Sequence, residues 1–335
     1  MNGVQGAASS GEQKGSVSMN ARLLTLAAAL RSVLGDEFVV EAGPLARYTS
    51  LRVGGPADLL VTAGSVEALR QAVSLAWELG MPCCVLGSGS NVLVADGGIR
   101  GLVVINRTRA ASIVEGGLRA ESGAALATMA RLAVSAGLAG LEWASGIPGT
   151  VGGAVAGNAG AWGSDVASTL RQAVVLQADG SLDTWSAERF EYGYRTSLLK
   201  RSGTGRRAVV LDAEFRLSPA DEQTLRARVA EIGARRRASQ PTGASCGSVF
   251  RNPSGDYAGR LVEAAGLKGE RRGDAVISPV HANFIVNEGG ASARDVRSLV
   301  ELMRREVQAR FGVSLELEIE LLGEWAPAEN QKGNN

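Results

Sequence analysis

The stretch GIPGTVGGAVAGNAG, residues 146–160, contains six glycines and decides how this chain can be interpreted. A shorter stretch of the same kind, LGSGSN, covers residues 86–91. Glycine has no Cβ atom, so its backbone N–H can approach an anion closely, and the Ser and Asn side chains add further donors. The glycines could also serve only tight turns and close packing. Because both stretches are expected between β-like segments, we predict that they hold one shared ligand, a nucleotide pyrophosphate.

The familiar short nucleotide motifs do not match these stretches. Gly87-x-Gly89 continues with Val92 where a dinucleotide fingerprint needs a third glycine. A looser match, Gly203-x-Gly205-x-x-Ala208, leads into a strand-like segment and not into a helix. A P-loop motif is absent from the sequence. The predicted cradle therefore belongs to another type of fold.

Composition excludes several classes of protein. The 335 residues include 35 basic and 34 acidic residues, and this net charge of +1 argues against nucleic acid or an anionic membrane as partner. The 44 glycines follow no Gly-X-Y period, which excludes collagen. Cys83, Cys84 and Cys246 do not form the pattern of a disulfide framework and favour a cytoplasmic location. The longest charge-free run, residues 143–164, is too rich in glycine for a transmembrane helix.

A single histidine, His281, limits the possible chemistry. It excludes a histidine cluster, and with three scattered cysteines it offers no zinc-ligand spacing, so no metal is expected. Residues 243–247 match G-x-S-x-G, but a nucleophile elbow needs a strand before it and a helix after it. Pro241 precedes this match and the β-like Val249-Phe250 follow it. We therefore expect His281 to be an ordinary polar residue near the start of a strand.

The distribution of periodic segments predicts a mixed α and β chain in several parts. Residues 1–18 are small and polar and are expected to form a disordered tail, with Met19 as a possible true start. We predict a first subdomain over 19–110, a second over 111–240, a C-terminal domain over 241–325 and a tail over 326–335. Helices are predicted at residues 20–34, 65–79, 124–136, 220–238, 257–266 and 292–310. Strands are predicted at residues 59–61, 82–86, 92–94, 102–105, 111–122 (a hairpin), 172–177, 182–185, 208–217, 275–278, 283–287 and 314–321.

Seven segments, in this order and at this spacing, resemble the UDP-N-acetylenolpyruvoylglucosamine reductase (MurB) family. The resemblance runs from about residue 20 to residue 323. The stretch between Ser248 and Asn283 is short, as in the shorter class of the family that lacks a tyrosine-bearing insertion. The segments are residues 48–57, 86–91, 146–154, 158–163, 194–197 with Lys200, 247–253 and 282–287.

This resemblance implies a fold and an activity. The fold would be α+β: an FAD-binding fold of the PCMH, or vanillyl-alcohol-oxidase, type in two subdomains, followed by a C-terminal α+β substrate-binding domain. FAD would be bound non-covalently, and NADPH would be the reductant. The reaction would be the reduction of UDP-N-acetylglucosamine enolpyruvate to UDP-N-acetylmuramate in peptidoglycan precursor synthesis. Two alternatives are another FAD oxidoreductase of this fold acting on a small alcohol or sugar, and a nucleotide-binding module without activity.

The resemblance also implies three catalytic residues. Ser248 matches the family's proton donor, and Arg195 matches the arginine that faces the substrate carboxylate. Glu318 matches the glutamate beside the enolate. On a strand, Glu316, Glu318 and Glu320 would share one face, and spacing alone does not choose among them. The flanking segments 312–313 and 322–323 select Glu318 by resemblance.

Further site residues follow from the same resemblance. Glu320 departs from the family, which usually has a basic residue there, and Arg251 stands where the family has lysine. The expected substrate contacts are Tyr194, Arg237, Asn252 and Asn283. The expected FAD contacts are Gly54, Gly55, Gly87, Ser88, Gly89, Ser90, Asn91, Ile147, Pro148, Gly149, Gly152, Gly153, Ala154, Asn158 and Gly160.

Overall fold

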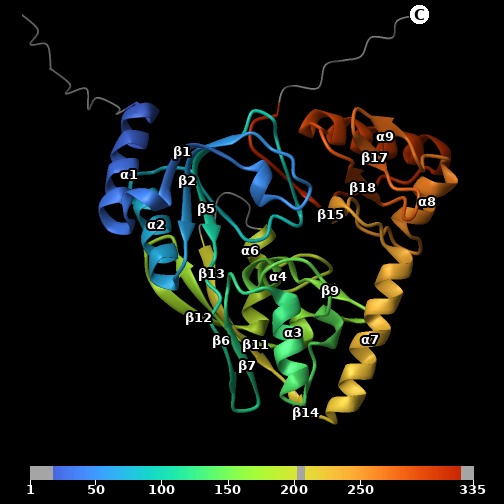
Figure 1. The fold of residues 1–335 in the computed structure, drawn as a ribbon, viewed down its shortest axis with the longest axis horizontal. Coiled ribbons are helices and arrows are strands. Elements are labelled where there is room, and N and C mark those ends of the chain that lie inside the picture. The colour runs from blue at the N-terminus through green and yellow to red at the C-terminus, as the bar shows by residue number, and fades with distance from the viewer. Residues whose placement is uncertain (1–17, 202–207, 326–335) are drawn as a thin grey trace, which may run out of the picture.

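The computed structural model describes residues 18–201 and 208–325. Three sheets, each with its own helices, are arranged around the middle of the molecule (Figure 1). The predicted tails at 1–18 and 326–335 lie outside the described residues, except for Ser18, which caps the first helix. The division of the chain at residues 110 and 240 stays a prediction.

The first sheet has the strand order β1-β2-β5-β3, in which β2, β5 and β3 run parallel and β1 is antiparallel. Ser65 starts one covering helix as predicted, because its side chain accepts a hydrogen bond of 3.1 Å from the N–H of Ala68. Both helices bury apolar faces against the sheet. The elements are α1 (Met19–Leu34), β1 (Val39–Pro44), β2 (Pro56–Ala63), α2 (Val66–Glu78), β3 (Cys83–Leu86) and β5 (Ile99–Asn106).

The second sheet is a five-stranded antiparallel sheet with the order β12-β11-β13-β7-β6. Its core contains the fully buried Trp185, Phe190 and Phe215 together with side chains of α3 and α4. The predicted hairpin at 111–122 is confirmed by the pairing of β6 with β7. The elements are β6 (Ala111–Val114), β7 (Gly117–Glu121), α3 (Leu126–Ser135), α4 (Val151–Gly157), β11 (Leu170–Gln177), β12 (Leu182–Ser186) and β13 (Ala208–Arg216).

Helix α4 lies within the long glycine stretch, which was expected between β-like segments and for which no helix was predicted. Glycine is a poor helix former, and the sequence therefore gives little sign of this helix. Thr150 caps its start, and Val151 and Val155 bury their side chains in the core of the second sheet. Tertiary packing thus overrides the low helix propensity of the stretch.

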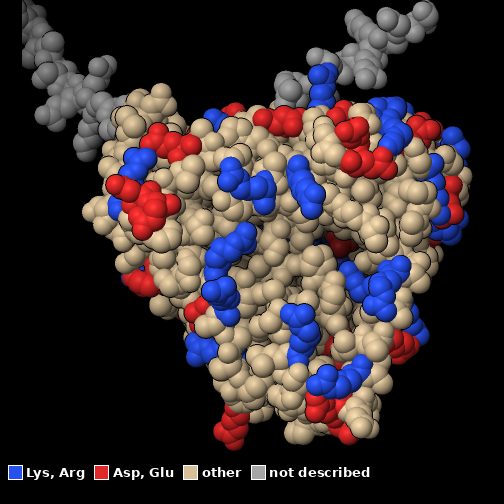
Figure 2. All heavy atoms as spheres, in the orientation of Figure 1, with Lys and Arg blue, Asp and Glu red and all other residues tan. Residues whose placement is uncertain are grey.

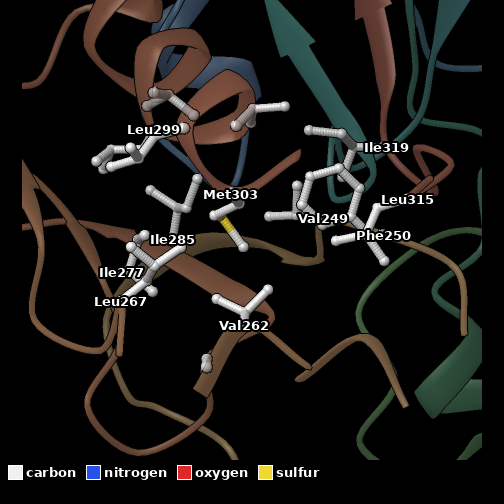
Figure 3. Close-up of a cluster of buried hydrophobic side chains, with 14 of the residues drawn as sticks. Val249, Phe250, Val262, Leu267, Ile277, Ile285, Leu299, Met303, Leu315 and Ile319 are labelled. Atoms are coloured by element: carbon white, nitrogen blue, oxygen red, sulfur yellow. The ribbon is translucent and has the colours of Figure 1, made fainter. Parts of the chain in front are cut away.

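Helix α7 (Glu222–Ser239) runs along one side of the molecule and leads to the third sheet (Figure 1). That sheet is antiparallel, with the order β15-β18-β17-β16. In Figure 3 its core gathers around Met303 of α9. The elements are β15 (Ala244–Ser248), α8 (Ala258–Ala264), β16 (Arg271–Arg272), β17 (Ala275–Ile277), β18 (Phe284–Asn287) and α9 (Ala293–Phe311). The helices predicted for this part, and α1, α2, α3 and α7, are confirmed within a few residues.

The predicted strand at 314–321 is wrong in extent. Only β19 (Glu320–Leu322) is a strand, and it pairs in parallel with β4 (Val92–Val94), beside the first sheet. Before it, Leu317 forms a single bridge to Phe250. The C-terminal segment 312–322 therefore crosses from the third sheet back to the first part of the chain. The remaining short elements are β8 (Leu138–Ala139), β9 (Gly160–Ala161), β10 (Ser164–Asp165), α5 (Val166–Thr169), α6 (Leu198–Arg201) and β14 (Ser218–Pro219).

Within residues 18–201 and 208–325, no helix is long and apolar enough to cross a membrane. The charge-free run 143–164 folds into α4 and into short turns and strands on either side of it.

Candidate active site

A cleft of about 1170 Å³ opens where the three sheets meet. Its walls are the two glycine stretches, the segment from Arg195 to Lys200, residues 245–248 and the C-terminal segment at Glu318 and Glu320. Figure 2 shows a hollow near the middle of one face with basic side chains on several sides of it. Pockets for drug-sized ligands have volumes of roughly 300–1,000 Å³. This cleft can therefore accept a ligand larger than a single small substrate.

The two glycine stretches touch each other, as their predicted shared ligand requires. The hydroxyl of Ser90 donates a hydrogen bond of 3.1 Å to the carbonyl oxygen of Pro148. A Cβ atom on Gly87 would collide with the side chain of Thr150. The backbone N–H groups of residues 87–90 donate no hydrogen bond to any other described residue. These free donors beside the cleft fit an anionic group such as a pyrophosphate.

The glycines themselves fall into two groups. At Gly87, Gly89 and Gly152 a Cβ atom would meet other parts of the protein at less than 3.0 Å, so glycine is needed there for close packing. At Gly153 and Gly157 on α4, no described atom outside the chain neighbours and the helix's own backbone lies closer than 3.6 Å to such a Cβ. These two residues are four apart on one face of the helix, and both line the cleft. Packing of the protein does not require glycine at these two positions. A flat ligand lying against α4 would require glycine there, because a side chain would occupy its space.

Gly54 and Gly55 were expected to contact FAD, and the structure places them away from the cleft wall. A Cβ atom on Gly54 would meet Val94, and one on Gly55 would collide with the carbonyl oxygen of Asp96. The N–H of Gly55 donates to the carbonyl oxygen of Ala95 at 2.9 Å. Both glycines therefore allow the chain to pack against the segment after β4, and their contact with FAD stays a prediction.

Asn158, another expected FAD contact, also has a different role. Its amide donates to Asp165 Oδ2 at 3.1 Å and to the carbonyl oxygen of Gly193 at 3.0 Å. Two further side chains fix the same turn: Tyr192 donates to the carbonyl of Val155, and Ser197 to that of Ala156. The end of α4 thus holds the turn that carries Arg195.

Arg195 occupies the left-handed region, with φ of 56°. Such a conformation costs free energy in a non-glycine residue, and it persists here because the surrounding hydrogen bonds fix the turn. Arg195 Nε lies 3.0 Å from Glu318 Oε1. The Nε–H is buried but not aligned for a hydrogen bond with any described acceptor. The guanidinium of Arg195 is therefore held in the cleft wall beside Glu318.

Glu318 is surrounded by cations. Burial raises the pKa of its carboxyl group, and the charges of Arg195, Lys200 and Arg251 oppose that shift. The net effect is upward, so a protonated Glu318 persists to a higher pH than an exposed glutamate would. The chemistry implied for this residue, hydrogen-bond donation to an enolate, needs the protonated form.

The three glutamates do not share one environment, contrary to the prediction from strand alternation. The side chain of Glu316 is 78% exposed, with Arg251 3.9 Å away. Glu318 is only 19% exposed, and Glu320 pairs with Lys200 at 2.8 Å. The alternation fails because residues 316–319 are not a strand.

Ser248 is the last residue of β15 and lies in the cleft wall. Its hydroxyl forms no hydrogen bond with another described residue. The next residue, Val249, accepts a hydrogen bond of 2.9 Å from the backbone N–H of Glu318. The serine and the glutamate are therefore held in the same wall of the cleft.

Three of the expected substrate contacts, Tyr194, Arg237 and Asn252, are not among the residues that line the cleft, and their contact with substrate stays a prediction. Asn252 accepts from the N–H of Ala258 at 3.1 Å, and Tyr194 is 56% exposed beside the guanidinium of Arg195. Arg237 is exposed, whereas the preceding Arg236 lines the cleft. Burial lowers the pKa of Arg236, and no acidic residue in the described ranges pairs with it. Arg236 is thus a functional candidate that the sequence interpretation missed by one residue.

Asn283 was also expected to contact substrate, and both polar atoms of its amide are hydrogen-bonded within the protein. Oδ1 accepts from the N–H of Phe250 at 3.0 Å, and Nδ2 donates to the carbonyl oxygen of Phe250 at 2.8 Å. The residue is 3% exposed. Asn283 thus holds the segment that follows Ser248.

The substitution Asn283→Ala is expected to lower the free energy of unfolding by about 1–3 kcal/mol. It leaves the buried N–H and carbonyl of Phe250 without partners. Urea unfolding of the variant and the parent measures this difference. Asn252→Ala is the control, with a smaller expected loss because Asn252 accepts one bond near the surface. An unchanged unfolding midpoint for Asn283→Ala, with a raised KM for substrate, would instead support the original prediction.

Two other features of the sequence have structural roles. The G-x-S-x-G match lies mostly within β15 and not at a strand-to-helix turn, which excludes a nucleophile elbow. His281 Nδ1 accepts from the N–H of Asn283 at 3.2 Å, just before β18, where an ordinary polar residue was expected. Among the described residues, no group of three or more His, Cys, Asp or Glu side chains could hold a metal ion.

Comparisons with known proteins agree with this geometry. The model for the C-terminal domain of UDP-N-acetylenolpyruvoylglucosamine reductase matches residues 240–322, and an FAD binding domain model matches residues 57–185. The UDP-N-acetylenolpyruvoylglucosamine reductase of Rubrobacter xylanophilus is 47% identical over 283 residues, covering 84% of this chain and 94% of that protein. The Chloroflexus aggregans enzyme of that name is 45% identical, covering 83% and 96%. The crystal structure of the Thermus caldophilus enzyme (MurB) aligns with a TM-score of 0.72 at 38% identity, covering 85% and 98%.

Proposed function

The chain belongs to the UDP-N-acetylenolpyruvoylglucosamine reductase family, and from this membership we propose which of its residues carry out the reaction. It is a flavin-dependent oxidoreductase of peptidoglycan synthesis that uses FAD and NADPH. It reduces UDP-N-acetylglucosamine enolpyruvate to UDP-N-acetylmuramate. The comparisons support this activity and not an oxidase of small alcohols or sugars.

The residues that would hold FAD are those of the two glycine stretches. The free N–H groups of residues 87–90 would bind its pyrophosphate, and the face of α4 at Gly153 and Gly157 would lie against a flat part of it. Bound FAD supplies the redox chemistry, as the carrier of hydride between NADPH and the enolpyruvyl group.

Ser248, Arg195 and Glu318 line one cleft together with both glycine stretches. The roles proposed for these three residues rest on this observation. Arg195 would bind the substrate carboxylate, because its guanidinium lines the cleft and a guanidinium pairs well with carboxylates. Glu318, whose carboxyl pKa is raised by burial, would donate a hydrogen bond from its protonated form to the developing enolate. Ser248 would then give its proton to the enolate carbon. A hydroxyl is a weak acid, but a carbanion-like carbon is basic enough to accept its proton.

Arg236 would bind a phosphate of the UDP group from the α7 side of the cleft, in place of the predicted Arg237. Nucleic acid, membrane and metal are not proposed as partners, and the cytoplasm stays the predicted compartment.

One assay tests the function directly. NADPH oxidation by the purified yellow protein is expected to depend on added UDP-N-acetylglucosamine enolpyruvate. A protein without flavin absorbance after reconstitution with FAD, or without substrate-dependent NADPH oxidation, would contradict the proposal.

The substitution Glu318→Gln is expected to remove the alkaline limb of the pH profile of kcat. In the parent, activity that needs protonated Glu318 is complete below the raised pKa and falls as pH rises through it. Glutamine keeps an N–H donor that does not titrate, so a lower but flat rate is expected over this limb. The exposed Glu316→Gln serves as control and should keep the parent profile. If Glu318→Gln retains the alkaline limb, another group titrates there.

A further inference from the structure

Two ion pairs cross the cleft next to each other. Arg195 contacts Glu318, and five residues after Arg195, Lys200 Nζ lies 2.8 Å from Glu320 Oε1. The Lys200 side chain, on α6, is only 20% exposed. Both members of this second pair line the cleft, and the reaction steps above do not use them.

The carboxylate side of both pairs is anchored to the first part of the chain through Asn91. The Asn91 amide donates to the carbonyl oxygen of Glu318 at 3.2 Å. Its own carbonyl oxygen accepts from the N–H of Glu320 at 2.9 Å. Since β19 also pairs with β4, the backbone of both glutamates is fixed. Lys200 therefore connects the second part of the chain to a rigid anchor.

One member of this pair, Lys200, acts on the carboxyl of Glu318. The cations acting on its carboxyl are Arg195, Lys200 and Arg251. Glu320 is two residues away and would be an uncompensated negative charge without Lys200. A single charge within about 4–6 Å can shift a pKa by roughly 1–3 units.

The thiol of Cys84 is another titratable group near Glu320. Burial, and then the charge of Glu320, raise its pKa to about 11, so it stays neutral near pH 7. The neutral thiol of Cys84 therefore adds no charge near Glu320, and Lys200 is the cation that pairs with Glu320.

We propose that Lys200 and Glu320 are positioning residues of the reductase, whose ion pair holds the second part of the chain against the C-terminal segment and keeps the charge beside Glu318 balanced. The proposal rests on the function proposed above, in which the carboxyl of Glu318 faces the reacting carbon. It assigns a role to the glutamate that replaces the family's usual basic residue.

The test measures how two single variants shift the alkaline limb of the pH profile of kcat, which reports the titration of Glu318. In Glu320→Gln, Lys200 becomes an unpaired cation, and the alkaline limb of kcat is expected about one pH unit lower. In Lys200→Met, Glu320 becomes an unpaired anion, and the limb is expected about one pH unit higher. A pair that only stabilises the fold would give no opposite shifts.

A direct spectroscopic titration accompanies the kinetics. The infrared absorption of the protonated Glu318 carboxyl is followed against pH in the full-length protein, with Glu318→Gln as the reference. This titration should shift in the same two directions as the kinetic limb. It reports on the charge balance even if the substrate were wrongly assigned, so failure of the function and failure of this inference are distinguishable.

A double variant that exchanges the charges of Lys200 and Glu320 tests the proposal further, and the neighbouring pair of Arg201 with Glu191 provides a control. The double variant Lys200→Glu with Glu320→Lys should bring the limb back to within a few tenths of a pH unit of the parent, and it decides the question if either single variant fails to fold. Arg201 lies on the same helix, α6, as Lys200, and Arg201→Met removes its exposed ion pair with Glu191, so this variant should leave the limb unchanged. Shifts of the same sign in both single variants, no shift in either, or no recovery in the double variant would overturn the proposal.

Discussion

Replacing Ser248 by alanine is expected to slow reduction of the enolpyruvyl group about 10²- to 10⁴-fold, while NADPH still reduces the bound FAD at the parent rate. General acid catalysis contributes about this much, and the structure offers Ser248 as an unengaged hydroxyl in the cleft wall. The two half-reactions separate because hydride transfer from NADPH needs no proton from this residue. Stopped-flow absorbance of the flavin, first with NADPH alone and then with substrate, measures them independently.

Two further variants sharpen this experiment. Ser248→Cys keeps a side chain that can donate a proton, and it should recover part of the lost rate. Ser254→Ala, at an exposed position after the same segment, should retain the parent rates. Equal losses in both half-reactions of Ser248→Ala would show that the residue positions the flavin and does not donate the proton.

The substitution Gly157→Leu is expected to weaken FAD binding about 5- to 150-fold without harming the fold. A Cβ at Gly157 would point into open space at the cleft, since no described atom outside its chain neighbours and the helix's own backbone lies within 4 Å of it. The added side chain would occupy the space of the ligand, and overpacking of this kind costs about 1–3 kcal/mol. Leucine is also a better helix former than glycine, so the apoprotein should be at least as stable as the parent.

FAD titration followed by fluorescence, together with thermal unfolding of the apoprotein, checks this prediction. Gly64→Leu is the matched control, because Gly64 is exposed, has open space around a Cβ, and lies outside the cleft lining. A yellow Gly157→Leu protein with parent FAD affinity would mean that the flavin does not lie against this face of α4.

The sequence alone predicted the elements that have strong local signals. Ser65 caps its helix as expected, and the hairpin at 111–122 forms, because capping and turn chemistry act between near neighbours. Helix α4 escaped prediction, because buried Val151 and Val155 stabilise it and its glycines obscure it. Only contacts distant in the sequence specify such an element.

The sequence predicted which types of residue form the site better than it predicted which partners those residues contact. Glu318 could not be chosen from the alternation of three glutamates, since Arg195, far away in the sequence, distinguishes it. Arg236 and Arg237 differ by one residue, which rotates a side chain about 100° around a helix. Asn283 looks like a ligand contact in a motif, but both of its polar atoms bind the backbone of Phe250. For Glu318 and Asn283 the decisive partner is a tertiary neighbour.

The parallel pairing of β19 with β4 has a consequence for how the protein is made. The contact between Asn91 and Glu318 joins residues 227 positions apart, so the ribosome must synthesise nearly the whole chain before it can form. The glycine stretches and Arg195 emerge long before the segment that completes their cleft. During translation the nascent chain therefore exposes an unfinished flavin site, and loss of the last strand by premature termination would leave that site without one wall.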